Sequence, residues 1–290
     1  MEYCDVSSSR PANRDPLDAI IIGGGPAGLS AALVLGRCLR HVLVCDVGHP
    51  RNEAAKVFNG YLSRDGSTPG EFFQICRAQL QRYETVEFRK VKVVDVERGD
   101  RRFTAVLETG ERVASRMLLL AIGLVDELPE TENFREFYGR SAHSCAYCDD
   151  WEHRGQPIAV TGCTQGAADL GIELILWSKD VILCTNGVLT CDSRARETIR
   201  RLGIRIVETP IARLEGKSGE LEGIRFTDGS FLPRTALFFL KPASISAPIS
   251  PSSLAVSFAK RMAVFNAPKI RRRACRVSMQ RAMRVAARNS

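Results

Sequence analysis

The sequence contains no long apolar run and no apolar leader. No stretch approaches the roughly 18 apolar residues that cross a bilayer as a helix. The first segment, Met1 to Asp18, is polar and lacks the apolar core of a secretion signal. We therefore expect no membrane partner and a cytoplasmic location.

The sequence also lacks a second closely spaced cysteine pair. Of its ten cysteines, only Cys145 and Cys148 lie near each other in the chain. In a reducing compartment this pattern favours buried thiols plus one reactive or metal-binding pair. Structural zinc sites normally use two such pairs, so no metal is expected. A zinc site completed by His143 or His153, and an inert pair of buried thiols, remain as alternatives.

Acidic residues and glycine are absent from the last fifty residues. Residues 241–290 hold eleven Lys or Arg and no Asp, Glu or Gly. Residues 1–240 hold the remaining 30 basic residues and all 33 acidic residues, and are therefore slightly acidic. The net charge of +8 comes from residues 241–290 and does not indicate a basic face on the globular part. We expect no specific nucleic-acid binding, since basic runs are usually solvated. We interpret residues 241–290 as a poorly packed or helical extension outside both cores.

The length of the chain is sufficient for two domains. The 290 residues are 44% hydrophobic and 26% charged, which is ordinary for a globular protein.

A glycine-rich turn follows the first apolar run. Residues 19–22 read as a strand, residues 29–39 as a helix, and residues 41–45 as a second strand ending at Asp46. The turn between strand and helix contains Gly23, Gly25, Pro26, Ala27 and Gly28. Its spacing is that of a dinucleotide-binding turn, in which glycines allow close approach of a pyrophosphate to the helix N-terminus. Asp46 is placed to accept hydrogen bonds from ribose hydroxyls.

The same order of elements occurs twice. In the first half, a capping box at residues 68–71 opens a helix, and residues 86–123 suggest a β-meander. In the second half, residues 157–161 read as a strand, 162–168 as a turn into a helix, and 181–184 as another strand. Residues 204–240 suggest a second meander, with a hairpin turn at Asp228-Gly229. The repetition predicts an α/β fold with two Rossmann-like, three-layer ββα, dinucleotide-binding domains.

The second glycine-rich turn departs from the pattern. Gly162 and Ala167 occupy the first and last positions of the turn, but Thr164 stands at the middle glycine, where its Cβ would crowd a pyrophosphate. The next strand ends in residues 185–187, Thr-Asn-Gly, which supply neither an acid for a ribose nor an arginine pair for a 2′-phosphate. Nicotinamide binding and a Rossmann-like half without it both remain open.

The cysteine pair has the spacing of a redox-active disulfide. Cys145 and Cys148 enclose two residues, so one turn can join them, and free N–H groups in such a turn lower a thiol pKa. Asp149 follows directly and could hold a proton for a departing thiolate.

Together these residues resemble the thioredoxin reductase family of low-molecular-weight pyridine nucleotide–disulfide oxidoreductases. The likeness covers about residues 18–240 and is carried by residues 145–149, Arg154, Gln156, 158–162 and the crossover 121–123. Residues 50–52 and 62–66 look like a branch that includes oxidases of small dithiols.

The resemblance implies cofactors, partners and roles. FAD would bind Gly23 to Gly28 and Asp46, with Arg51 and Gly123 also at the cofactor. NADPH would bind the turn of Gly162, Thr164 and Ala167. Cys148 would face the flavin, Cys145 would attack the partner's disulfide, and Asp149 would be the acid. The partner would be a thioredoxin-like protein or a small disulfide or dithiol, and the enzyme a homodimer.

The resemblance also divides the chain. It implies an FAD-binding domain over 1–123 and, inserted in it, an NAD(P)-binding-like domain with the cysteine pair over 124–240. Residues 241–290 stand where the family returns to the FAD domain with a Gly-Asp motif that this segment lacks. We therefore expect weak FAD retention. The alternatives to an NADPH-driven reductase are a dithiol oxidase passing electrons through FAD to oxygen, and a non-catalytic remnant.

Overall fold

The computed structural model describes residues 16–240 and 243–245. The chain divides into two compact units. The larger unit contains Leu17–Val91 and Leu118–Ser246. The main described segment of the smaller unit is Lys92–Met117. Within the described residues no helix combines the length and apolarity needed to cross a membrane.

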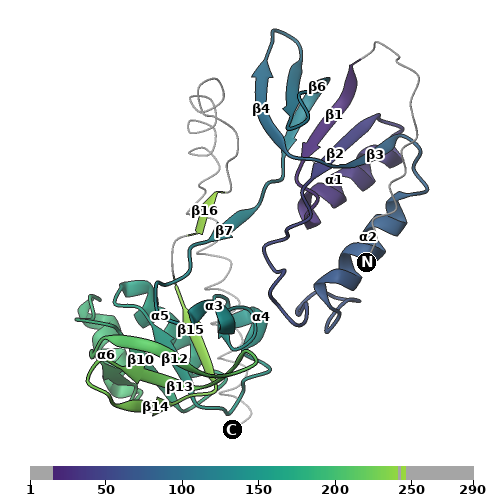
Figure 1. The fold of residues 1–290 in the computed structure, drawn as a ribbon. Helices are drawn as coiled ribbons and strands as arrows, with labels where there is room; N and C mark the ends of the chain where they lie inside the picture. The colour runs from purple at the N-terminus through teal and green to yellow at the C-terminus, as the bar shows by residue number, and fades with distance from the viewer. Residues whose placement is uncertain (1–15, 241–242, 246–290) are drawn as a thin grey trace. The chain divides into compact units, whose positions relative to one another are not determined.

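A parallel sheet opens the larger unit (Figure 1). Strand β2 lies between β1 and β3 and runs parallel to both. Helices α1 and α2 pack on it through Leu29, Ala32 and Leu80, which join the buried strand residues in one core. The prediction that the meander begins at residue 86 is wrong, because the first alternating run pairs parallel to β2 instead. The elements are β1 (Leu17–Ile22), α1 (Pro26–Arg37), β2 (Val42–Asp46), α2 (Pro69–Leu80) and β3 (Val86–Lys90).

The predicted capping box starts α2. The Thr68 hydroxyl accepts from the Glu71 N–H at 3.2 Å, and a Glu71 carboxylate oxygen accepts from the Thr68 N–H at 2.9 Å. Pro69 occupies the first helical position. Two N–H groups that the helix itself cannot satisfy are thereby satisfied.

We expect Thr68→Ala to lower the free energy of unfolding by about 1 kcal/mol, because the Glu71 N–H loses its acceptor. Urea unfolding of both proteins measures this difference. Thr68→Ser is the control, since it retains the hydroxyl and should stay within about 0.5 kcal/mol of the parent. Equal stability of the alanine and serine variants would contradict the assignment.

The smaller unit is an antiparallel meander. Strand β5 pairs with both β4 and β6, and β6 continues along the chain into residues of the larger unit. The predicted meander is therefore confirmed from residue 93 onward. Its strands are β4 (Val93–Arg98), β5 (Phe103–Leu107) and β6 (Arg112–Leu120).

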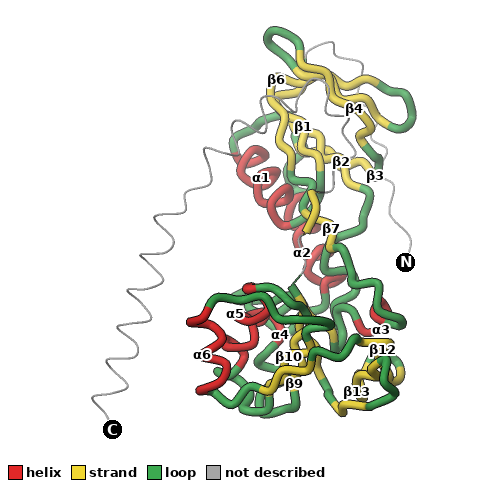
Figure 2. Tube along the Cα trace, turned by 90° about the vertical axis from the view of Figure 1, so that its left-hand side faces the viewer, coloured by secondary structure: helices red, strands yellow, loops and turns green. Residues whose placement is uncertain are grey.

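A second parallel sheet, in the order β11-β10-β9-β15-β8, forms the middle layer of the second half. Figure 2 shows α5 and α6 on one side of its strands and β12 and β13 on the other. One apolar core lies between the sheet and the helices, and a second lies between the sheet and the antiparallel strands. The elements are α3 (Phe134–Phe137), β8 (Ala142–His143), α4 (Ala146–Asp149), β9 (Ile158–Thr161), α5 (Gln165–Leu174), β10 (Val181–Cys184), α6 (Ser193–Arg201), β11 (Arg205–Val207), β12 (Ile211–Lys217), β13 (Glu220–Phe226), β14 (Phe231–Pro233) and β15 (Ala236–Phe239).

This layering confirms the predicted three-layer ββα arrangement, with one correction. The second predicted meander shrinks to β12, β13 and β14, while β11 and β15 belong to the parallel sheet. The hairpin turn at Asp228-Gly229 joins β13 to β14 as expected.

The segment after residue 240 also requires a correction. Strand β16 (Ala243–Ile245) pairs antiparallel with β7 (Leu124–Asp126), so three of its residues are in a sheet. The rest of the prediction for 241–290 lies outside the described residues.

Candidate redox site and nucleotide-binding turns

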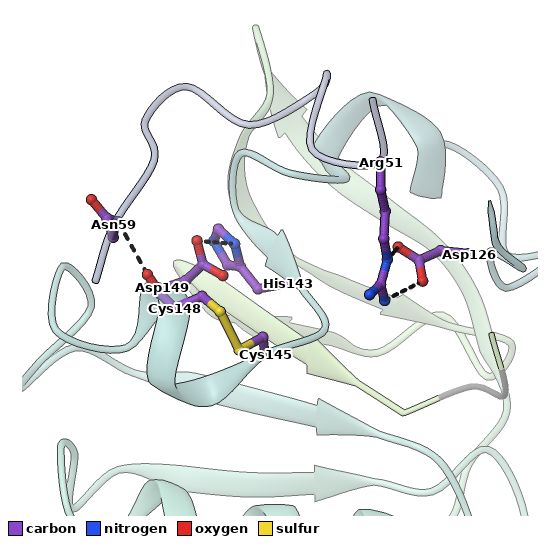
Figure 3. The surroundings of a disulfide bond; sticks show 7 residues. All are labelled: Arg51, Asn59, Asp126, His143, Cys145, Cys148 and Asp149. Atoms are coloured by element: carbon purple, nitrogen blue, oxygen red, sulfur yellow. Dashed lines mark hydrogen bonds and ion pairs between the residues drawn. A yellow bond between two sulfur atoms is a disulfide. The ribbon is translucent and has the colours of Figure 1, made fainter. Parts of the chain in front are cut away.

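The structure joins the predicted cysteine pair in a disulfide (Figure 3). Cys145 precedes α4 and Cys148 lies within it, and their Cα atoms are 5.4 Å apart. Cys148 is exposed to solvent and Cys145 is half-buried. At least one residue of the pair is therefore open to solvent.

The residue between the cysteines ties this turn to helix α5. The Tyr147 hydroxyl donates to the Glu173 carboxylate, and its ring meets Trp177 edge-on with centroids 5.7 Å apart. Ala146 beside it is buried in the same core as the sheet and helices. The turn that carries the disulfide is therefore held in place by contacts of Tyr147 and Ala146 that do not involve the sulfur atoms.

Asp149 lies against a buried histidine. Its Oδ1 is 3.3 Å from Nδ1 of His143, a side chain only 6% exposed, and Figure 3 shows the carboxylate turned toward that ring. Nε2 of His143 is in turn 3.0 Å from Nε2 of His153. The two histidines considered as zinc ligands are therefore hydrogen-bonded to each other. No group of three or more metal-ligating side chains occurs in residues 16–240.

Asp150 is a buried carboxyl with no hydrogen-bond partner in the described part of the chain. Its side chain is completely buried and both oxygen atoms are unsatisfied. Burial, followed by repulsion from Asp149 and Glu173, raises the pKa of Asp150 to about 7. Sequence reasoning missed this group, because nothing in an Asp-Asp pair indicates which carboxyl faces inward.

Two residues from the loop after β2 reach the second half. The Asn59 side chain donates to the Cys148 carbonyl at 3.1 Å. The Arg51 guanidinium donates to Asp126 from Nε at 2.9 Å and from Nη2 at 2.5 Å, and the Tyr138 hydroxyl donates to the same carboxylate. Although burial opposes it, hydrogen bonds from Arg51 and Tyr138 lower the pKa of Asp126. Arg51, predicted to contact a cofactor, has its guanidinium on Asp126, and its role toward a cofactor stays a prediction.

The first glycine-rich turn is tight at two positions and open at one. A Cβ at Gly23, where φ is +105°, would lie 2.2 Å from the Ala121 carbonyl oxygen, and one at Gly28 would lie 1.9 Å from the Gly23 carbonyl oxygen. A Cβ at Gly25 would meet nothing within 4 Å. Pro26 and Ala27 begin α1 directly beside this open space. The cradle fits a pyrophosphate held by the helix N-terminus.

Asp46 lies beside the same turn. A Cβ on Gly24 would come within 2.8 Å of its carboxylate, which also receives a hydrogen bond from Arg77 Nη2 at 3.3 Å. Arg77, on α2, had no sequence signal. The crossover residue Gly123 has φ of +67° and open space around its missing side chain. These positions fit the ribose side of an FAD site.

The second turn fits a nucleotide less well. A Cβ at Gly162 would lie 3.1 Å from that of Ala167, which is fully buried, so these two positions pack as a dinucleotide turn requires. Thr164 immediately precedes α5 and makes no capping hydrogen bond with its side chain. After β10, the Thr185 hydroxyl donates to the Gly187 carbonyl and Asn186 Oδ1 accepts from the Ile211 N–H at 2.8 Å. No side chain of the loop 185–187 offers a cation to a 2′-phosphate.

Comparison with known proteins agrees with this architecture. A family model described as pyridine nucleotide-disulphide oxidoreductase matches residues 17–239. Thioredoxin reductase tcpT of Claviceps purpurea is 33% identical over 227 residues, which are 74% of this chain and 70% of that protein. Thioredoxin reductase sirT of Leptosphaeria maculans is 36% identical over 145 residues, 49% of this chain and 44% of that protein.

A solved structure shares the fold. The crystal structure of the oxidoreductase from Agrobacterium tumefaciens superposes with a TM-score of 0.75 at 32% identity, covering 80% of this chain and 77% of that one. The chain spans between 44% and 70% of the length of five curated relatives.

Proposed function

The chain belongs to the pyridine nucleotide-disulphide oxidoreductases, and from that premise we propose that it is a flavin-dependent thiol–disulfide oxidoreductase of thioredoxin reductase type. The observation that carries the proposal is the disulfide between Cys145 and Cys148, with Asp149 beside it. We assign FAD binding to residues 1–123, and the redox pair with the second nucleotide turn to residues 124–240.

Different residues of the chain would bind FAD, exchange the disulfide and transfer the proton. The turn from Gly23 to Gly28 and the Asp46 carboxylate would hold FAD, whose chemistry is two-electron transfer between a thiol pair and a second redox partner. In the reductase direction, the Cys145 thiolate of the reduced pair attacks one sulfur of the partner's disulfide, the partner's S–S bond breaks, and its other sulfur leaves and takes up a proton from Asp149. Cys148 then returns a proton to Asp149 and attacks Cys145, so that the Cys145–Cys148 bond re-forms and the second partner sulfur is released as a thiolate.

The partners follow from the same resemblance. We propose a thioredoxin-like protein or a small disulfide or dithiol as the substrate, and a homodimer in the cytoplasm as the working form. The thioredoxin reductases among the relatives support this substrate class.

A dithiol oxidase is the second candidate, and the second nucleotide turn favours it. Thr164 occupies the place of the middle glycine, and the Thr185 and Asn186 side chains are engaged by the Gly187 carbonyl and the Ile211 N–H. Electrons would then come from a small dithiol and pass to oxygen, with NADPH unused.

An anaerobic absorption spectrum tests both candidates. We expect the flavin band of the purified protein, supplied with FAD, to bleach when dithiothreitol is added, and Cys148→Ser to prevent this bleaching because the pair no longer closes. Bleaching by NADPH as well identifies a reductase, and bleaching by the dithiol alone identifies the oxidase. Failure to bind FAD would overturn both and leave a non-catalytic remnant.

A further inference from the structure

We propose that His143, His153 and Asp149 form a hydrogen-bonded row that stores one extra proton beside the disulfide and passes it to the cysteine pair during reduction. The two histidines act as positioning residues through Asp149. The proposal rests on the proposed function and deepens it.

The row is continuous from the disulfide turn to the start of β9. Oδ1 of Asp149 is 3.3 Å from Nδ1 of His143 (Figure 3), and the two Nε2 atoms of His143 and His153 are 3.0 Å apart. Nδ1 of His153 is 3.1 Å from Oε1 of Gln156. The ring of Phe238 lies 5.4 Å from that of His143, so the inner part of the row is covered by the core.

Both ends of the row are acceptors. The carboxylate of Asp149 accepts at one end. At the other, Oε1 of Gln156 accepts from the Thr235 hydroxyl at 3.1 Å while its Nε2 donates to the Glu152 carbonyl at 3.4 Å. The reversed amide would place two carbonyl oxygens against each other, so the hydrogen-bond network favours this orientation of Gln156.

Counting protons shows what the row must hold. Each of the three contacts needs one proton, so three of the four ring nitrogens carry one, or two do and Asp149 is protonated. Two neutral imidazoles supply only two protons. The third is an extra proton, which balances the negative charge of Asp149 and leaves the row neutral.

The groups around the row favour the extra proton at the end formed by Asp149 and His143. Burial lowers the pKa of His153 although its hydrogen bond to Gln156 opposes this, so His153 is assigned the neutral form, which donates to Gln156 and accepts from His143. The titratable groups that interact electrostatically with the row are Asp150 and Glu152 of its own segment and Tyr138, whose hydroxyl is already committed to Asp126. The extra proton is thus shared between His143 and Asp149, next to Cys148 in the chain.

In the reaction with a small dithiol, the protons and electrons balance when the row gives up its extra proton and later regains it. One thiolate of the reagent attacks Cys145, the S–S bond breaks, and the Cys148 thiolate takes the stored proton. The row then removes the proton of the second reagent thiol, whose sulfur displaces Cys145 as a thiolate. The reagent loses two electrons and leaves as a disulfide, the cysteine pair gains them, and the row ends with its proton restored.

Nitrogen NMR of the oxidised protein labelled with ¹⁵N-histidine tests the proton count. Protonated and unprotonated ring nitrogens have well-separated shifts, and His143→Gln and His153→Gln assign the signals. At pH 7 we expect three protonated nitrogens among the four of the two rings, or two together with a protonated Asp149 carboxyl, which its ¹³C shift reports, and loss of the extra proton in Asp149→Asn. Two neutral rings next to an ionised Asp149 would overturn the proposal. The measurement needs neither flavin nor substrate, so its outcome is separate from that of the proposed function.

Alkylation of the reduced pair tests the link to chemistry. With iodoacetamide and peptide mass spectrometry, His143→Gln should slow the reaction of Cys148 at pH 6.5 about tenfold, a shift of about one unit in the pH profile, because an uncompensated Asp149 disfavours the thiolate. His153→Gln should shift the profile in the same direction by less. The control is His49→Gln on an exposed loop, with melting curves confirming that all variants fold. Superimposable profiles for His143→Gln and the parent would refute the relay.

Discussion

Replacing Gly25 by valine is expected to weaken FAD binding roughly 100-fold or more while leaving the fold intact. The backbone at Gly25 has a φ of −72°, which any residue adopts, and a Cβ there meets no protein atom within 4 Å. The space that the side chain would fill is the space proposed for the pyrophosphate. Fluorescence titration of the apoprotein with FAD, together with its melting temperature, measures the two effects separately.

Gly28→Ala provides the contrast for this prediction. Its added Cβ would lie 1.9 Å from the Gly23 carbonyl oxygen, so the backbone itself must move and the apoprotein should lose stability by about 1–3 kcal/mol. An unchanged affinity for FAD in Gly25→Val would show that the flavin does not use this turn.

Replacing Asp150 by asparagine is expected to remove a large pH dependence of stability. The pKa of this carboxyl rises from an ordinary 3.8 to about 7 in the folded protein. Its contribution to stability is therefore fully present below pH 4 and is lost as the pH rises toward 7, because the unfolded chain releases the proton that the folded chain retains. At about 1.4 kcal/mol per unit of pKa, a shift of about three units corresponds to a loss of roughly 4 kcal/mol by pH 8.

The comparison is the unfolding free energy of Asp150→Asn and the parent between pH 4 and pH 8. The stability of the variant relative to the parent should rise from pH 4 to about pH 7 and then level off. Asp228→Asn is the matched control, since hydrogen bonds from Ser230 lower the pKa of that exposed carboxyl and its contribution is lost in acid instead. A constant difference between Asp150→Asn and the parent would show that Asp150 is ionised in the folded state.

Local patterns predicted most of the fold. The strand, glycine turn and helix at each nucleotide-binding half, the capping box at Thr68 and the pairing of Cys145 with Cys148 all depend on residues within a few positions of each other. The predicted antiparallel pairing is wrong for the strands at 86–90 and 205–207. A short alternating run has the same pattern beside a parallel or an antiparallel neighbour, and its partner is decided by tertiary packing.

The contacts of the candidate site that sequence reasoning missed follow no local pattern, and two of them cross long sequence separations. Asn59 reaches Cys148 from 89 residues away, and Arg51 reaches Asp126 from 75. His143 and His153 were noted as candidate ligands for zinc, yet only the structure shows that they face each other and Asp149. No spacing rule connects such residues, because the loops that bring them together have no periodic pattern.

The anchor of Tyr147 determines what happens when the disulfide opens. Its hydrogen bond to Glu173 and its contact with Trp177 do not involve the sulfur atoms, so the turn keeps its shape after the S–S bond breaks. The two thiols then remain at high effective molarity toward each other. A substrate attached to one sulfur meets the second sulfur before any thiol arriving from solution, and the mixed disulfide is resolved within the molecule.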